Sequence, residues 1–279
     1  MALDISSVGA TAVLTAHLRA LESTRWDALF DDPWAEKLVA SSDVDLSAVS
    51  LAGVLESRIY PSVAVRTHYL DLWCGPATES GVQQIVVLGA GLDTRALRLG
   101  WLDQGIEVWE LDRADVVEFK TSALAVESEH WHAVTADLRD DGWFDRLTAT
   151  GFDPERPALW ICEGVFMYLG DDVARGAVRT IADRSREPEL LGVHFGLGAL
   201  WEEGTRSMSD AAGAHGYGFL SVLAPEPAQW LGPSWSVRDC RSIADHGVLL
   251  GRRIPYDEAA LGEKVTWLFT ATTTHATDH

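Results

Sequence analysis

The stretch VVLGAGLDTR, residues Val86–Arg95, decides the fold that this sequence predicts. A short β-branched run ends in Gly89 and Gly91, and helix-forming residues follow, so the stretch predicts a strand, a tight turn and a helix. Glycines at the carboxyl end of a buried strand allow a ligand to approach the backbone where a doubly wound sheet changes direction. A G-x-G pattern alone does not identify that ligand.

Beyond this turn the chain alternates between predicted strands and predicted helices. The strands are expected at 106–111, 131–135, 158–162 and 189–195, and the helices at 114–126, 143–149 and 171–186. Such alternation predicts a parallel sheet with helices on both faces. The expected fold class is therefore α/β, with a Rossmann-like, mostly parallel, doubly wound sheet.

The flanking segments are expected to complete a single domain over residues 1–279. Residues 1–80 are expected to form an N-terminal helical cap, and residues 81–195 the ligand-binding core. Residues 196–235 are rich in Gly, Pro and Trp and have poor periodicity, which predicts a lid or substrate-binding insertion. Residues 236–279 are expected to supply the last strands.

Local patterns predict the elements of these flanks. Cap helices are expected at 11–21, from about Pro33, and at 57–73, and a closing hairpin from 236–241 and 265–273. In the third cap helix the apolar residues Val65, Tyr69 and Leu72 are expected on one side. Arg66 is displaced from that side.

Charge and composition exclude several classes of protein. The chain has 22 Lys and Arg against 42 Asp and Glu, a formal charge of -20, which repels phosphate backbones and anionic membranes. Neither nucleic acid nor a membrane is therefore an expected partner. Cys74, Cys162 and Cys240 are widely spaced and form no C-x-x-C pair, so we expect reduced thiols and no metal site.

The first 20 residues do not resemble an export signal. No Lys or Arg precedes their apolar residues, and Asp4, His17 and Arg19 interrupt the run. No stretch approaches the roughly 20 apolar residues of a membrane-spanning helix. We therefore expect a cytoplasmic protein.

Asp93 indicates the charge of the ligand at the glycine turn. A dinucleotide fingerprint has a third glycine where this chain has Thr94, and a carboxylate at Asp93 would repel a pyrophosphate. A phosphate-free nucleoside with an ammonium and a sulfonium, such as S-adenosylmethionine, fits that charge. The alternative is that Asp93 stabilises the N-terminus of the following helix.

Three more acidic residues end or follow predicted strands. Asp112 lies about 20 residues after the glycine turn, where a carboxylate can bind both ribose hydroxyls, although it can also cap the next helix. Asp137 and Leu138 follow the third strand, at the expected place of an adenine amino group and ring. Glu163 leaves a buried strand and needs a partner, either the ligand's ammonium or a nearby Arg.

Five segments together resemble the leucine carboxyl methyltransferase superfamily. More closely, they are similar to its actinobacterial branch of S-adenosylmethionine-dependent O-methyltransferases, over roughly residues 18–195. The segments are VRTHYLD (65–71), VVLGAGLDTRALRL (86–99), ELDRADVVEFK (110–120), ADLRDD (136–141) and WICEGVFMYL (160–169). The resemblance implies the class I methyltransferase form of the α/β fold and S-adenosyl-L-methionine as cofactor.

The resemblance also implies roles for individual residues. Arg66 pairs with the cofactor's carboxylate, Glu163 contacts its ammonium, and Gly89 lies beneath its amino acid portion, with Gly91 and Asp93 in the same turn. Asp112 holds the ribose, and Asp137 with Leu138 frames the adenine. A basic residue near the N-terminus touches the cofactor in carboxyl-methylating relatives, and Arg19 is a candidate for it.

The acceptor is expected to be a small molecule or peptide methylated on oxygen, with secondary metabolism as a candidate setting. A carboxylate is already ionised near pH 7, whereas a hydroxyl benefits from a general base. Tyr168 and His194 are the candidate catalytic residues, each with a packing role as its alternative. Trp201, Trp230 and Trp235 suit an aromatic acceptor, or pack in the lid and core.

Two other functions stay open. One is a nicotinamide-dependent oxidoreductase, although Asp93 and the absent third glycine argue against it. The other is a cofactor-binding protein without catalytic activity. The oligomeric state has no signature in the sequence.

Overall fold

We describe a computed structural model of the chain for residues 7–44, 59–195, 226–254 and 266–274. Its helices are α1 (Ser7–Ser23), α2 (Pro33–Ala40), α4 (Ile59–Glu79), α5 (Arg95–Arg98), α6 (Ala114–Leu124), α7 (Trp143–Ala149), α8 (Asp171–Arg184), α10 (Pro227–Leu231), α11 (Ile243–Leu249) and the 3-10 turn η1 (Phe166–Tyr168). The strands are β1 (Gln84–Leu88), β2 (Glu107–Asp112), β3 (Trp131–Thr135), β4 (Ala158–Cys162), β5 (Pro188–Phe195), β6 (Trp235–Ser242) and β7 (Thr266–Thr273).

All seven of these strands lie in one sheet, in the order β3-β2-β1-β4-β5-β7-β6. Strands β1 to β5 are parallel, whereas β7 is antiparallel to both β5 and β6. The expected α/β fold with a mostly parallel sheet is confirmed. The expected closing pair also forms, and β7 inserts between β5 and β6.

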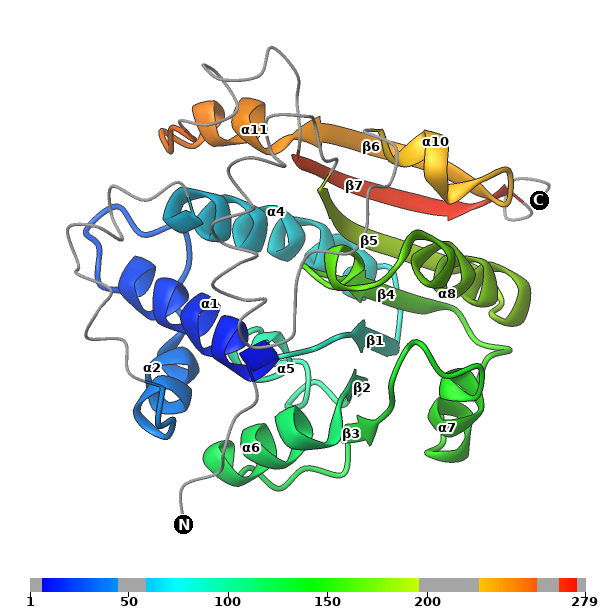
Figure 1. Cartoon of the computed structure of the whole chain (residues 1–279), viewed down its shortest axis with the longest axis horizontal. Helices are drawn as coiled ribbons and strands as arrows, with labels where there is room; N and C mark the ends of the chain where they lie inside the picture. The colour runs from blue at the N-terminus through cyan, green and yellow to red at the C-terminus, as the bar shows by residue number, and fades with distance from the viewer. Residues whose placement is uncertain (1–6, 45–58, 196–225, 255–265, 275–279) are drawn as a thin grey trace.

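Helices cover both faces of this sheet (Figure 1). On one face, α7, α8 and α10 pack on the sheet around Trp143, Trp160 and Trp230. On the other face, α4, α5 and α11 pack around Tyr69 and Leu191. Each residue of β1 and β4 is buried, because the central strands are covered on both sides, and this explains their continuous apolar sequence.

The N-terminal helices form a separate layer over the carboxyl end of β1. Apolar side chains of α1 and α2 pack with Leu92, which follows the glycine turn, and with Phe119 of α6. Helix α2 starts at Pro33, as predicted, with Asp32 as its N-cap. The prediction for Leu72 of α4 was wrong: Val65 and Tyr69 are buried, but Leu72 is 55% exposed because α4 turns that position away from the sheet.

A buried arginine bonds the cap to the far end of the chain. Arg252, just after α11, donates from Nη2 to Glu22 Oε1 over 2.8 Å and from Nη1 to Asp27 Oδ2 over 2.9 Å. The hydroxyl of Tyr60 donates to the other oxygen of Glu22. Both Glu22 and Arg252 are buried, so the pair is shielded from solvent.

The predicted lid is described only at its end. Residues 196–225, which include Trp201, lie outside the described residues. Residues 226–235 contain α10, whose Trp230 is buried between Phe166 and Phe269. Trp235 is also buried and opens β6, so these two tryptophans pack in the core.

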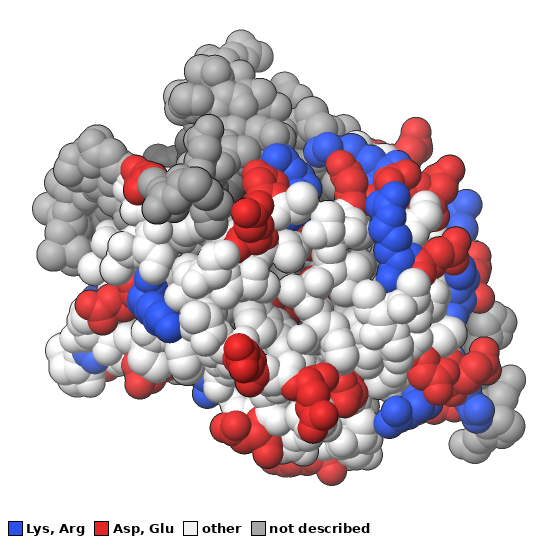
Figure 2. Space-filling model, turned by 90° about the horizontal axis from the view of Figure 1, so that it is seen from below, with Lys and Arg blue, Asp and Glu red and all other residues white. Residues whose placement is uncertain are grey.

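On the face seen in Figure 2, acidic and basic side chains are interspersed, although the chain as a whole carries a formal charge of -20.

None of the helices that the structure describes is long and apolar enough to cross a membrane.

The turn after β1 depends on glycine for two separate reasons. Gly89 has φ +61° and Gly91 has φ +49°, the left-handed region that L side chains rarely adopt. A Cβ on Gly89 would lie 2.5 Å from Cγ2 of Val165, which is far inside van der Waals contact. A Cβ on Gly91 would lie 3.5 Å from the Cβ of Ala12 in α1, which is ordinary contact. The turn is therefore closed in by the segment after β4 and by the first helix.

We expect Gly89→Ala to lower the free energy of unfolding by about 1–3 kcal/mol, because it combines backbone strain with overpacking against Val165. Urea denaturation measures this change. Gly176→Ala is the control: Gly176 lies in α8 with nothing within 4 Å of its Cβ position. That substitution should raise stability by about 0.5–1 kcal/mol. Equal stability of Gly89→Ala and the wild type would contradict the prediction.

Candidate active site

Most of the predicted binding residues lie at the carboxyl edge of the parallel strands. Gly89 and Gly91 follow β1, Asp112 ends β2, Asp137 follows β3 and Glu163 follows β4. Strands β2 and β3 are added on one side of β1, and β4 and β5 on the other side. The order of the strands in the sheet therefore switches between β1 and β4. In open α/β sheets a ligand binds in the crevice at that point. The topology therefore brings these residues to one edge, as the sequence predicted.

Asp112 is bonded directly to the glycine turn. Its Oδ2 accepts a hydrogen bond from the Gly91 amide over 2.6 Å, and its Oδ1 accepts from the Arg113 amide over 2.7 Å. Burial raises the pKa of Asp112, while these two amides oppose the shift. Each carboxylate oxygen has a further lone pair, so Asp112 can still accept from hydroxyl groups of a ligand.

Asp93 bonds back to the start of the next helix. Its Oδ1 accepts from the Arg95 amide over 2.7 Å, and its Oδ2 pairs with Arg95 Nη1. Burial by itself raises the pKa of Asp93, but the nearby cations of Arg95, Lys120 and Arg19 lower it well below its usual range. The local helix-start contact considered for Asp93 is therefore present, and the carboxylate is held ionised.

Glu163 is shared between two arginines, one on each oxygen. Arg66 Nε donates to Oε1 over 2.8 Å, and Arg95 Nη1 lies 2.7 Å from Oε2. Burial alone raises the pKa of Glu163, but Arg95 and then Arg66 lower it below its usual value. Of the two partners considered for Glu163, the structure contains the arginine. The sequence predicts that Arg66 meets the carboxylate of the cofactor and that Glu163 meets its ammonium. In this structure the two side chains are paired with each other.

Arg66 keeps donors for a further partner. Within the described part of the chain Glu163 is its one hydrogen-bonded partner, and that bond uses Nε. Its Nη1 and Nη2 lie 3.8 and 3.9 Å from the position of a Cβ on Gly164, whose φ is +68°. A side chain at position 164 would therefore crowd this guanidinium.

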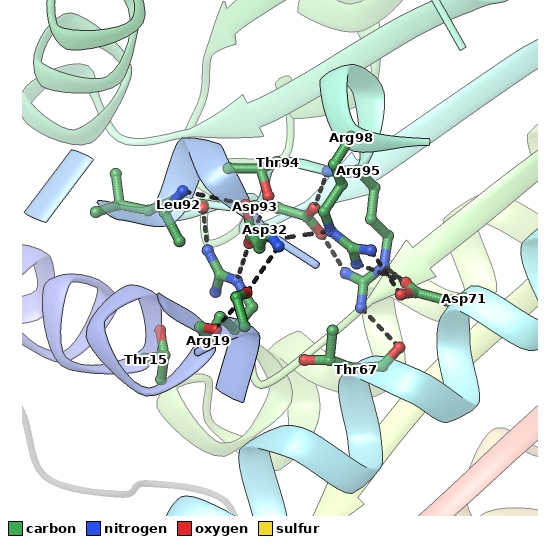
Figure 3. A network of polar contacts seen from close by, with 12 residues as sticks. Thr15, Arg19, Asp32, Thr67, Asp71, Leu92, Asp93, Thr94, Arg95 and Arg98 are labelled. Atoms are coloured by element: carbon green, nitrogen blue, oxygen red, sulfur yellow. Dashed lines mark hydrogen bonds and ion pairs between the residues drawn. The ribbon is translucent and has the colours of Figure 1, made fainter. Parts of the chain in front are cut away.

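Arg95 is the centre of a buried ionic cluster that the sequence reasoning missed (Figure 3). Its side chain is 2% exposed, and it joins Asp93, Glu163 and Asp71. Arg95 Nε donates to Asp71 Oδ1 over 2.7 Å, and Nη2 donates to the carbonyl oxygen of Thr67 over 3.4 Å. Arg98 binds the same Asp71 through both terminal nitrogens, each over 2.7 Å. Helices α4 and α5 are thereby bonded beside the glycine turn.

A second buried carboxylate, Asp32, ties the cap to the same turn. Arg19 Nε donates to Asp32 Oδ2 over 2.8 Å, and Thr94 Oγ1 donates to that oxygen over 2.7 Å. The Ala35 amide donates to Oδ1 over 3.1 Å, the N-cap bond of α2. Arg19 also donates to the carbonyl of Leu92 over 2.6 Å. Arg19, the candidate for the basic residue near the N-terminus, therefore lies against the turn. Its contact with a cofactor stays a prediction.

The remaining predicted residues are less enclosed. Asp137 accepts from the Arg139 amide over 2.9 Å and has a side chain that is 44% exposed, while Leu138 packs against the core beneath it. Tyr168 ends η1 and is half-buried, with its neighbour Phe166 packed on Trp230. His194 lies in β5 in register with Trp267, but its side chain is outside the described residues.

Comparisons with known proteins identify the family of this chain. The family model described as leucine carboxyl methyltransferase matches residues 12–182. A Saccharopolyspora erythraea protein classed with the S-adenosyl-L-methionine-dependent methyltransferases is 43% identical over 196 residues, 68% of each chain. A Streptomyces coelicolor protein of the same class is 35% identical and covers 88% of this chain and 89% of its own.

Two solved structures share the fold. One, from Thermobifida fusca and classed with the methyltransferases, has a TM-score of 0.59 at 18% identity and covers 92% of this chain and 94% of its own. The other, from Streptomyces avermitilis, has a TM-score of 0.60 at 14% identity, with 92% and 95% covered. At these identities the likeness concerns the fold alone.

The fold is thus the Rossmann-like class I methyltransferase fold. The chain belongs to the leucine carboxyl methyltransferase family and is an S-adenosyl-L-methionine-dependent methyltransferase. Family membership sets aside the nicotinamide oxidoreductase that the glycine turn had left open.

We expect Asp32→Ala to lower the free energy of unfolding by about 3–5 kcal/mol, because it leaves the buried Arg19 without its carboxylate and removes the cap of α2. Asp31→Ala is the matched control, since Asp31 is adjacent but exposed, and its effect should stay within about 0.5 kcal/mol. Urea denaturation of both variants tests this. Similar losses in the two variants would show that the Arg19–Asp32 pair contributes little.

Proposed function

We propose that this methyltransferase methylates an oxygen atom, a carboxylate or a hydroxyl group, of a small molecule or peptide. Secondary metabolism is a candidate setting. The observation that carries the cofactor part of the proposal is the pairing of Glu163 with Arg66 at the edge of the sheet. A carboxylate and a guanidinium side by side complement the ammonium and carboxylate of an amino acid. The family's carboxyl-methylating members support oxygen as the acceptor.

The residues at this edge suit S-adenosyl-L-methionine in charge. Gly89, the residue expected beneath the amino acid end, has no Cβ, and this lets Val165 after β4 approach the turn closely. Asp112, which accepts from the Gly91 amide, can also accept from the ribose hydroxyls. Asp137 and Leu138, after β3, offer a carboxylate and an apolar surface to the adenine. Bound there, the cofactor supplies an electrophilic methyl group on a sulfonium.

Electrostatics favours this cofactor over a phosphate-bearing one. Asp93 and Glu163 both have lowered pKa values, so both are ionised near pH 7, and Asp112 lies against the same turn. Carboxylates at a glycine turn attract ammonium and sulfonium charge and repel pyrophosphate. The protein's remaining contribution to methyl transfer is to align the acceptor and to exclude water.

The acceptor decides whether a base is needed. A carboxylate reaches the site ionised and needs only an orienting donor, for which the hydroxyl of Tyr168 is the candidate. A hydroxyl acceptor needs a base to take its proton, and His194 at the end of β5 is the candidate for that role. A small molecule or peptide is preferred over nucleic acid as the acceptor because the chain carries a formal charge of -20.

S-adenosylhomocysteine, the demethylated cofactor, should raise the melting temperature of the wild-type protein. Asp112→Ala and Arg66→Ala should each weaken its binding at least about tenfold, because each removes a charged partner of the ligand. Titration calorimetry measures the affinity. Asp103→Ala is the control, since Asp103 is exposed in the loop that enters β2 from the opposite edge. Wild-type affinity in the two site variants would contradict the placement.

Methyl transfer to oxygen has a chemical signature. With isotope-labelled S-adenosylmethionine and a panel of acids, alcohols and phenols, we expect label in a product whose methyl group is bonded to oxygen. Mild alkali releases labelled methanol from a methyl ester but leaves a methyl ether intact, so the hydrolysis separates carboxylate from hydroxyl acceptors. Label found on nitrogen or carbon would overturn the proposal. Cofactor binding with no product from any acceptor class would favour the non-catalytic alternative.

A further inference from the structure

Glu163 is held differently on its two sides. Its Oε2 pairs with Arg95, whose side chain is 2% exposed, and its Oε1 with Arg66, whose side chain is 12% exposed and has Nη donors to spare. Arg95 is fixed on every side, because the same guanidinium also bonds Asp93, Asp71 and the backbone of α4. Arg66 has no comparable second anchor among the described residues.

The charges around Arg95 are matched. Four carboxylates face four guanidiniums: Asp32, Asp71, Asp93 and Glu163 against Arg19, Arg66, Arg95 and Arg98. The amino acid end of a ligand carries one positive and one negative group. The carboxylate of such a ligand can pair with Arg66, and its ammonium can pair with the Glu163 Oε1 that Arg66 then leaves. Every charge then keeps a partner, and no buried charge is left alone.

We propose that Arg95 is a positioning residue for the amino acid end of the cofactor: it stays bonded to Glu163 Oε2 and to Asp93, while Arg66 exchanges from Glu163 Oε1 to the carboxylate of the ligand. This inference rests on the proposed function. Arg95 acts through the two carboxylates and is not itself a catalytic residue. Its bonds to Asp71 and Thr67 also hold α4, the helix that carries Arg66, beside Glu163.

The matched control is Arg98→Gln. Arg98 lies in the same short helix as Arg95, is equally buried and binds the same Asp71, but it has no bond to Glu163 or Asp93. Two probes separate the ends of the ligand: S-adenosylhomocysteine has the amino acid end, and 5′-methylthioadenosine has only the nucleoside and thioether. Titration calorimetry of wild type, Arg95→Gln and Arg98→Gln with both probes gives the comparison.

Arg95→Gln should weaken S-adenosylhomocysteine binding about 30-fold or more, because Glu163 and Asp93 lose their fixed partner. Its affinity for methylthioadenosine should change less than about threefold, and Arg98→Gln should leave both affinities near the wild-type values. Equal losses for the two probes, or equal losses in the two variants, would overturn the positioning role. Wild-type protein that binds neither probe would overturn the proposed function together with this inference.

The pH dependence gives a readout that a merely structural role would not change. Arg95 is the largest of the three influences that lower the pKa of Glu163, ahead of Arg66 and Arg19, while burial and Asp93 raise it. Removal of Arg95 should therefore raise that pKa. Affinity for S-adenosylhomocysteine requires the ionised carboxylate and is lost as pH falls through that pKa. The loss should therefore begin at a higher pH in Arg95→Gln than in Arg98→Gln. Superimposable pH profiles of the two variants would contradict the inference.

Arg95→Lys covers the case in which Arg95→Gln does not fold. The ammonium keeps a positive charge among the three carboxylates, but it cannot span Glu163, Asp93 and Asp71 as the guanidinium does. We expect Arg95→Lys to fold, to lose at least about fivefold in S-adenosylhomocysteine affinity, and to keep its methylthioadenosine affinity. Wild-type affinity for both probes in Arg95→Lys would overturn the proposal.

Discussion

A charge that is removed from water must have a partner, and this constraint organises the protein around its glycine turn. Arg95 is almost fully buried directly after the turn, and its partners come from three separate parts of the chain: Asp93 beside it, Asp71 on α4 and Glu163 after β4. Movement of any one of these carboxylates would break its bond to the guanidinium. One guanidinium therefore joins the segments at the edge of the sheet where the ligand is expected, although these segments are distant in sequence.

The sheet and the ionic cluster play complementary roles. The parallel strands bring the turn after β1, Asp112 and Glu163 to the same edge, and this follows from topology alone. Their orientation is set by polar contacts: the Gly91 amide holds Asp112, and two arginines hold Glu163. Apolar packing places the backbone, while charge and hydrogen bonding orient the side chains that would meet a ligand.

The sequence predicts the fold well because strand signals are local. Strand β3 and helix α7 begin and end where the pattern places them, and the antiparallel pair of β6 and β7 was expected. Leu72 shows the limit of periodicity, since an apolar side chain at a helical position can still face solvent. The order of β6 and β7 in the sheet depends on long-range pairing, which leaves no local trace.

The site was predicted only in part, for a physical reason. Residues that follow strand ends, such as Asp112 and Glu163, can be found because topology alone assigns their edge. Arg95, Arg98 and Asp71 resemble the charged residues of any solvated helix face, and only the tertiary structure shows that both arginine side chains are buried and that Asp71 is paired with them. Their mutual pairing requires α4 and α5 to be placed side by side, which no spacing within either helix reveals.

The bond from Arg252 to Glu22 has a consequence for how the molecule is made. Arg252 leaves the ribosome 230 residues after Glu22, its buried partner. Until then the buried carboxylate of Glu22 lacks its guanidinium, and contacts so distant along the chain form slowly. This bond can thus form only after residue 252 has been synthesised, and a nascent chain halted before it would leave Glu22 without its guanidinium.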